Sequence, residues 1–127
     1  MTSAEAIKKA NDVLPGKAAP EKHTDPRWQA IIAVGKFIEA DPMPVLEFAE
    51  HWGQHPDPDL RAAIATCLVE HLLEHHFSLV FPRVKSLARA NQLFGNTVSL
   101  CFKFGGTLEP QNSASFDQLV NEVGDAS

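Results

Sequence analysis

Two histidines and a glutamate near the middle of the chain have the spacing of a metal-dependent hydrolase. His71 and His75 stand four residues apart, so a helix would place both imidazoles on one face. Neutral imidazole is a common zinc ligand, and a neighbouring carboxylate such as Glu74 can act as a general base toward a zinc-bound water. A zinc-dependent hydrolase that uses His71, Glu74 and His75 is therefore one function that the sequence permits.

The surrounding sequence favours a simpler interpretation of this group. The pattern H-x-x-E-H resembles the motif of the inverted zinc peptidases, which need a further carboxylate ligand downstream, and only Glu109 and Glu122 are available. Histidine near a helix C-terminus also interacts well with the free carbonyl groups there. We therefore expect no catalytic residue, no bound metal and no cofactor. His71 and His75 remain weak metal candidates, which we expect to be packed within an apolar arc and hydrogen-bonded.

Other reactive side chains do not enlarge this group. His51 and His55 form a second pair at helical spacing, but antiparallel helices would place them ~15–20 Å from His71 at ~1.5 Å of rise per residue. Cys67 and Cys101 lie within apolar helical patterns. Buried thiols behave as small hydrophobic side chains, so we expect both cysteines to be reduced and without a nucleophilic role.

Charge is unevenly distributed along the chain. Residues 39–76 hold eight acidic side chains and one basic one, whereas residues 77–108 hold four basic side chains and no acidic one. Such runs usually form solvated faces, and the alternative is an acidic patch beside a basic patch that attracts a partner of mixed charge. The helices expected to line a concave face supply our candidate partner-binding residues: Glu47, Glu50, His51, Arg83 and Arg89.

Helix start and stop signals predict an all-α chain. Asp-Pro pairs at Asp25 and Asp57 are strong starts, since the carboxylate caps free N–H groups and proline fits the first turn. Pairs of glycine and proline mark the stops. The expected helices span residues 2–14, 26–40, 45–54, 57–76, 77–91 (with Pro82 in its first turn) and 91–104, and a short C-terminal helix begins with a capping box at Ser115.

The helix expected over residues 57–76 is the centre of this arrangement. At 100° per residue, Asp59, Thr66, Glu70 and Glu74 share one narrow polar arc, and apolar side chains cover most of the remaining circumference. A helix with so wide an apolar face is covered on several sides.

The helix starts repeat along the sequence. Asp25, Asp57 and Asn91 follow one another at nearly equal intervals, and the apolar positions after each of them match in register. A period of this length with a pair of helices per unit is typical of an α-solenoid.

The segments DPRWQAIIAVGKFI and DPDLRAAIATCLVEHL resemble the first helices of HEAT-type repeats. Arg61 matches an arginine typical of that family, and Gln29 stands at the corresponding place in the first copy. The resemblance covers about residues 25–104 and implies a short α-solenoid of about three HEAT-like units. Proteins of this family mostly bind other proteins, and a smaller branch binds DNA and removes alkylated bases.

Three regions follow from these patterns. We expect an N-terminal helix and linker at 1–24, a HEAT-like repeat domain at 25–106, and a C-terminal tail at 107–127 with an amphipathic stripe from Phe116 to Val123. The stripe could dock on its own chain or in a partner's groove.

Composition agrees with a globular cytoplasmic protein. The chain has 127 residues, 44% of them apolar, a formal net charge of −5, and no apolar run long enough for a membrane span. The sequence thus predicts a non-enzymatic protein–protein interaction or adaptor module with an unidentified protein partner and no membrane contact. The alternative is nucleic-acid binding through the basic segment 83–103, which the net charge disfavours.

Overall fold

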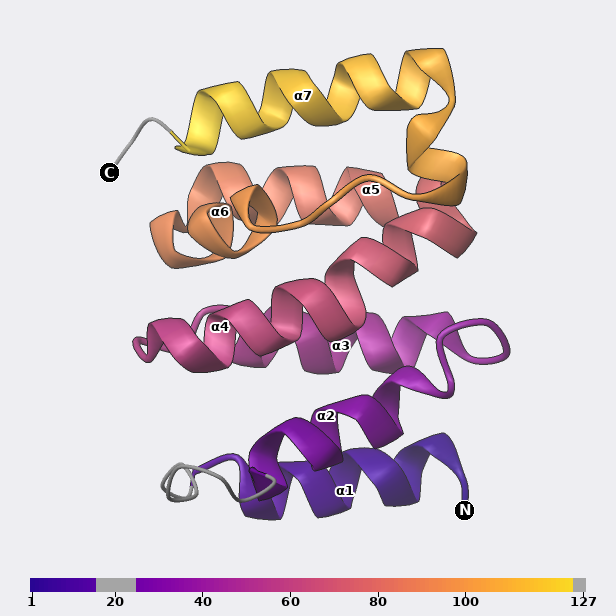
Figure 1. Cartoon of the computed structure of the whole chain (residues 1–127), viewed down its shortest axis with the longest axis vertical. Helices are drawn as coiled ribbons and strands as arrows, with labels where there is room; N and C mark the ends of the chain where they lie inside the picture. Colours follow the sequence, from indigo (N-terminus) through magenta and orange to yellow (C-terminus); the bar gives the residue numbers. More distant parts are fainter. Residues whose placement is uncertain (16–24, 125–127) are drawn as a thin grey trace.

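The computed structural model describes residues 1–15 and 25–124, and this part of the chain is helical without any β-strand. The helices lie one above another in a stack, with α1 at one end and α7 at the other (Figure 1). The elements are α1 (Ser3–Val13), α2 (Pro26–Gly35), α3 (Pro42–Trp52), α4 (Pro58–Ile64), a π-helical turn η1 (Ala65–Val69), α5 (Glu70–Ala90), α6 (Gln92–Ser99), a 3-10 turn η2 (Gly105–Leu108) and α7 (Pro110–Gly124). The predicted all-α class is confirmed.

The predicted helix starts are confirmed by their caps. The Asp25 carboxylate accepts a hydrogen bond from the backbone N–H of Arg27, and the Asp57 carboxylate accepts one from Asp59, each at 2.9 Å. The side-chain oxygen of Asn91 accepts one from Phe94 at 3.0 Å. Each of these contacts satisfies an N–H group that the helix itself leaves free. Thr2 and Glu5 form the predicted capping box of α1.

The predicted boundary between the helices 57–76 and 77–91 is a kink within one longer helix. His76 has φ −139° and ψ 43°, and its Nε2 lies 2.9 Å from the carbonyl oxygen of Ile38 in the loop after α2. Pro82 lies inside the segment that follows and not in its first turn, which corrects that detail of the prediction.

Several other helix bounds differ from the prediction. The helix from Pro26 ends at Gly35, where hydrogen bonds of the i to i−3 type replace helical ones and tighten the chain into turns. The expected turn at Pro42 is instead the first turn of α3, where a missing N–H costs nothing. The C-terminal helix begins at Pro110, before the expected capping box at Ser115, for the same reason.

The helix expected over 91–104 ends at Ser99, and this correction matters most for the site. The backbone N–H of Phe102 donates to the Glu70 carboxylate at 3.1 Å, and the ammonium group of Lys103 lies 3.0 Å from an Asp117 carboxylate oxygen. The contact with Glu70 takes the place of the i to i−4 hydrogen bond that the Phe102 N–H would have made in a longer α6.

The C-terminal helix docks on its own chain. Phe116, Leu119 and Val123 of the predicted stripe are buried, and α7 packs against α6 and α5. A Cβ atom added to Gly95 of α6 would come 3.0 Å from Val123, so this glycine lets the two helices approach closely. At the other end of the stack, α1 covers α2 and α3 through buried Ala6 and Ala10. The predicted linker lies for the most part in residues 16–24, outside the described residues.

No helix in the described ranges is long and apolar enough to cross a membrane.

Candidate binding groove

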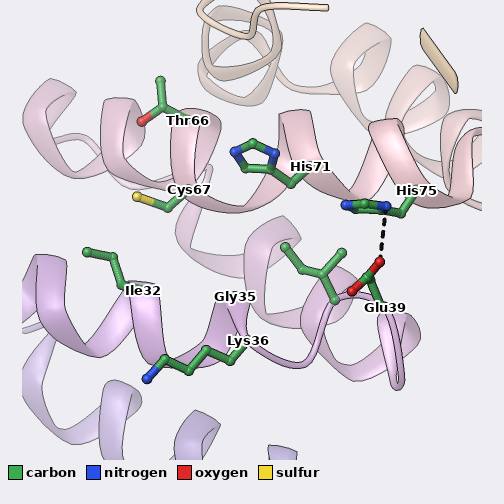
Figure 2. Close-up of a pocket in the computed structure, with 9 residues that line it drawn as sticks. Ile32, Gly35, Lys36, Glu39, Thr66, Cys67, His71 and His75 are labelled. Carbon is green, nitrogen blue, oxygen red and sulfur yellow. Dashed lines mark ion pairs between the residues drawn. The ribbon is translucent and has the colours of Figure 1, made fainter. Parts of the chain in front are cut away.

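A groove of about 470 Å³ separates α2 from η1 and the start of α5. Figure 2 shows Ile32 and Cys67 at one end of it and Glu39 and His75 at the other, with His71 between them. The remaining lining residues are Gly35, Lys36, Ile38 and Thr66. A Cβ atom at Gly35 would lie 3.3 Å from the carbonyl oxygen of Cys67, so glycine allows the two helices to meet closely beneath the groove.

The π-helical turn directs the two histidines into this groove. The expectation that His71 and His75 pack within an apolar arc is wrong, because their side chains are 39% and 38% exposed. A π-turn accommodates one extra residue, which rotates everything after it by about 100° relative to a regular α-helix. The same rotation buries Glu70, which the regular helix would have placed on its polar arc; its side chain is 6% exposed.

Carboxylates hold both imidazoles in place. The Nδ1 atom of His71 lies 2.8 Å from a Glu74 oxygen, and its Nε2 lies 3.5 Å from a Glu70 oxygen. The Nδ1 atom of His75 lies 3.5 Å from Glu39, as the dashed line in Figure 2 marks, and its Nε2 lies 3.6 Å from Glu74. Among the described residues, no group of three or more His, Cys, Asp or Glu side chains is arranged to hold a metal ion. The geometry therefore gives the zinc hydrolase no support.

Buried Glu70 fixes the chain segment that follows α6. Burial raises the pKa of its carboxyl group, and the hydrogen bond from Phe102 opposes that shift. The thiol of Cys101 donates to the carbonyl oxygen of Ala65 at 3.5 Å and also lies against this helix. Residues 100–104 are consequently held alongside η1 and α5, and Phe104 contacts His71 of the groove.

Neither cysteine forms a disulfide, as expected, and each residue is only partly buried. Cys67 lines the groove, which the apolar pattern did not predict. Burial raises the pKa of both thiols, that of Cys101 well above its ordinary value. A raised pKa keeps a thiol protonated, so neither cysteine is an activated nucleophile.

Large apolar side chains are exposed along the segment that runs beside the groove. We call this set the aromatic strip: Leu100 (44% exposed), Phe102 (66%), Phe104 (39%) and Leu108 (59%). The ring of Phe104 stacks on that of His71, with centroids 5.7 Å apart and planes at 16°. Phe102 borders a second groove, which α7 closes on its other side with Phe116 and Val120. Sequence reasoning missed the strip because it placed Leu100, Phe102 and Phe104 in a helix and Leu108 in the C-terminal tail; their apolar character was the available signal.

The five predicted partner-binding residues lie on α3 and the second half of α5. Glu50 forms an ion pair with Arg83, so the structure brings these two together. Glu47 and His51 line a shallow groove of about 520 Å³ between α3 and α1. Arg89 pairs instead with Glu122 of α7, at 2.8 and 2.9 Å.

Trp52 is buried at 9% exposure, and its indole N–H donates to the side-chain oxygen of Asn11 at 2.7 Å.

The basic segment is largely neutralised by ion pairs. Three of its four cationic groups contact carboxylates: Arg83 with Glu50, Arg89 with Glu122, and Lys103 with Asp117. Positive charge that is already paired attracts phosphate less strongly than free charge. Nucleic-acid binding through 83–103 stays a prediction.

Comparison with known proteins gives no relative: no family model matches the chain, and neither the curated proteins nor the solved structures contain a match.

Proposed function

We propose that this chain is a non-enzymatic protein-interaction module built from HEAT-like helical units. The repeat is supported by the three capped helix starts at Asp25, Asp57 and Asn91, which keep the nearly equal spacing found in the sequence. Stacked helices around a continuous core suit such a module, since each pair buries its apolar face against its neighbours.

The aromatic strip is the observation that carries the proposal. It places four large apolar side chains close together in sequence, all of them more than a third exposed; Phe102 borders the second groove, and Phe104 stacks on His71 of the first. Exposing such side chains together is unfavourable for a free monomer, and clusters of this kind commonly mark protein–protein contacts. Aromatic side chains also contribute heavily to binding energy where they become buried.

Both ends of the stack are closed, which leaves the sides for binding. The exposed polar residues of α1 include Glu5 and Lys9, and those of α7 include Gln111 and Gln118. Terminal helices with a polar outer face prevent further stacking. The strip and the groove lie on the side of the stack, where a partner segment could reach them.

Affinity capture with the full chain, followed by a direct binding measurement with the purified, identified partner, tests the proposal. We expect Phe102→Ser to weaken binding by about thirtyfold, the effect of losing one strongly contributing aromatic side chain of about 2 kcal/mol.

The matched control is Leu79→Ser, which removes an apolar side chain of similar exposure (52%) on α5, outside the strip. Equal binding by wild type and Phe102→Ser would argue against the strip as the surface that binds the partner. Metal-dependent hydrolysis by the purified protein, abolished by Glu74→Gln, would overturn the non-enzymatic assignment.

A further inference from the structure

The groove between α2 and η1 is amphipathic along its length. Its apolar end is formed by Ile32, Cys67 and the close helix approach at Gly35, and its polar end by Glu39 and His75 (Figure 2). A side chain that lies in it would contact carbon atoms along one part and polar groups at its tip. Long cationic side chains have this composition, since an aliphatic stem carries a charged head.

The polar end of the groove carries negative charge. Glu39 is 78% exposed, Glu74 is 26% exposed, and buried Glu70 stands behind the ring of His71. The lining cation, Lys36, extends toward the opposite end and away from Glu39 (Figure 2). Glu39 lines this end, and Glu74 and Glu70 stand behind the imidazoles, so the end attracts a positively charged group.

The ring of His71 in the groove stacks on the ring of Phe104 in the aromatic strip. The surface that favours a cation therefore continues from the groove to the strip. The face of an aromatic ring attracts a cation, and a planar guanidinium group also stacks on it. Apolar residues flanking such a cation would reach Phe102 and Ile32, which are 66% and 44% exposed. The negative charge and the exposed apolar side chains therefore both favour a ligand that has a cation flanked by apolar groups.

Resting on the function proposed above, we infer that the groove receives an arginine or lysine side chain from an apolar segment of the partner protein. The stem lies against Ile32 and Cys67, and the charged head reaches Glu39 and Glu74. Flanking apolar residues of the same segment contact the aromatic strip.

Selection of random twelve-residue peptides on the full-length protein, followed by affinity measurements on the best binder, tests this inference. We expect binders that combine arginine or lysine with large apolar residues. Replacing the cation of the best peptide by glutamate should weaken binding at least about tenfold, as loss of a charged contact in an interface does. Glu39→Lys in the protein should weaken the original peptide to a similar extent.

Two further measurements locate the peptide and its charge. The glutamate peptide should regain affinity for Glu39→Lys, because a double-mutant cycle isolates the contact between the two charges. Asp12→Lys is the matched control, since it makes the same charge change on an exposed residue of α1 in a different groove and should leave binding unchanged.

The possible failures are distinct. If no peptide binds at a site sensitive to Phe102→Ser, the proposed function itself fails. If peptides bind the strip but lack a cation requirement and tolerate Glu39→Lys, the inference about the groove is overturned while the interaction module stands. Selection of acidic peptides would also overturn it.

Discussion

Arg27 is the buried charge that joins two helix starts. Its guanidinium lies 3.1 Å from the Asp57 carboxylate, 3.4 Å from Asp25 and 3.5 Å from Asp59, while its own side chain is only 5% exposed. The N-terminal ends of α2 and α4 are therefore linked by one cation. Sequence reasoning missed this role, although Arg27 and Asp59 occupy equivalent places in the first two units of the proposed repeat and the acids at both helix starts were a usable signal.

Replacing Arg27 by methionine should destabilise the fold by about 2 kcal/mol, the usual loss for a hydrogen-bonded charged group whose partners remain. The carboxylates of Asp25 and Asp57 would then repel each other without a cation between them. Urea unfolding at neutral pH measures the change.

Arg83→Met is the control for this prediction. It breaks an ion pair whose arginine is 42% exposed, and should cost less than about 1 kcal/mol. Equal losses in both variants would show that Arg27 has no special role.

Glu70 should make stability depend on pH in a direction opposite to that of most carboxylates. Burial raises its pKa in the folded protein, so between the ordinary glutamate pKa and the raised value the folded state binds more protons than the unfolded state. Stability therefore falls as the pH rises through this interval, and the cost of the buried charge is complete above it. Glu70→Gln removes this titration and keeps an oxygen that can accept from Phe102.

The stability of Glu70→Gln relative to wild type should consequently improve as the pH is raised from strongly acidic to neutral. Urea unfolding at both values checks this, and other titrating groups cancel in the difference. A relative stability that stays constant or declines toward neutral pH would contradict the buried-charge assignment.

At the scale of elements, the helix starts capped by Asp25, Asp57 and Asn91 were predictable, whereas the ends of α2 and α6 were not. The caps at Asp25, Asp57 and Asn91 depend on residues next to them in sequence, so local chemistry is sufficient. The end of α6 depends on Glu70, which lies far earlier in the chain and takes the N–H of Phe102. No local signal at residues 99–104 reports that contact.

The π-turn η1 had the largest consequence for the site. Its residues Ala65–Val69 are ordinary helix formers in pattern, so a constant step of about 100° per residue was the natural assumption. One extra residue in the turn buries Glu70, which a regular helix would expose, and exposes His71, which a regular helix would bury. The residue types at the site were thus predictable, whereas their orientation required the tertiary structure.

Docking of α7 on α6 gives a direct stability prediction. Leu119 is 1% exposed, so Leu119→Ala should cost about 3 kcal/mol from lost burial and the cavity that remains. Gln118→Ala changes an exposed residue beside it and should cost less than about 0.5 kcal/mol. Thermal melting of both variants is the measurement. An unchanged melting temperature for Leu119→Ala would mean that α7 does not stay docked in solution.

At the scale of the whole molecule, the groove and the strip combine segments that are distant in sequence. Residues 32–39 supply one wall, residues 66–75 the other, and residues 100–108 the exposed rings. The repeat in the sequence predicted which helix starts correspond, but it could not predict a surface that depends on where α6 ends.

The charge of the whole molecule leads to a last prediction, that the wild-type protein does not bind short duplex DNA even at low salt. Its formal net charge is −5, and Arg83, Arg89 and Lys103 already contact carboxylates. Binding to phosphate gains its free energy by releasing counterions from DNA, which needs cations that are free to replace them. Electrophoretic mobility shift at low salt is the measurement.

A variant with Glu50→Gln, Asp117→Asn and Glu122→Gln frees the three cations without adding any, and serves as the matched control. Weak DNA binding by this variant, falling steeply as salt is added, would show that the ion pairs prevent the basic segment from binding DNA in the wild type. Salt-dependent binding by the wild type itself, lost in Arg83→Ala plus Arg89→Ala, would contradict the prediction. Nucleic acid would then replace protein as the partner of this stack of helices.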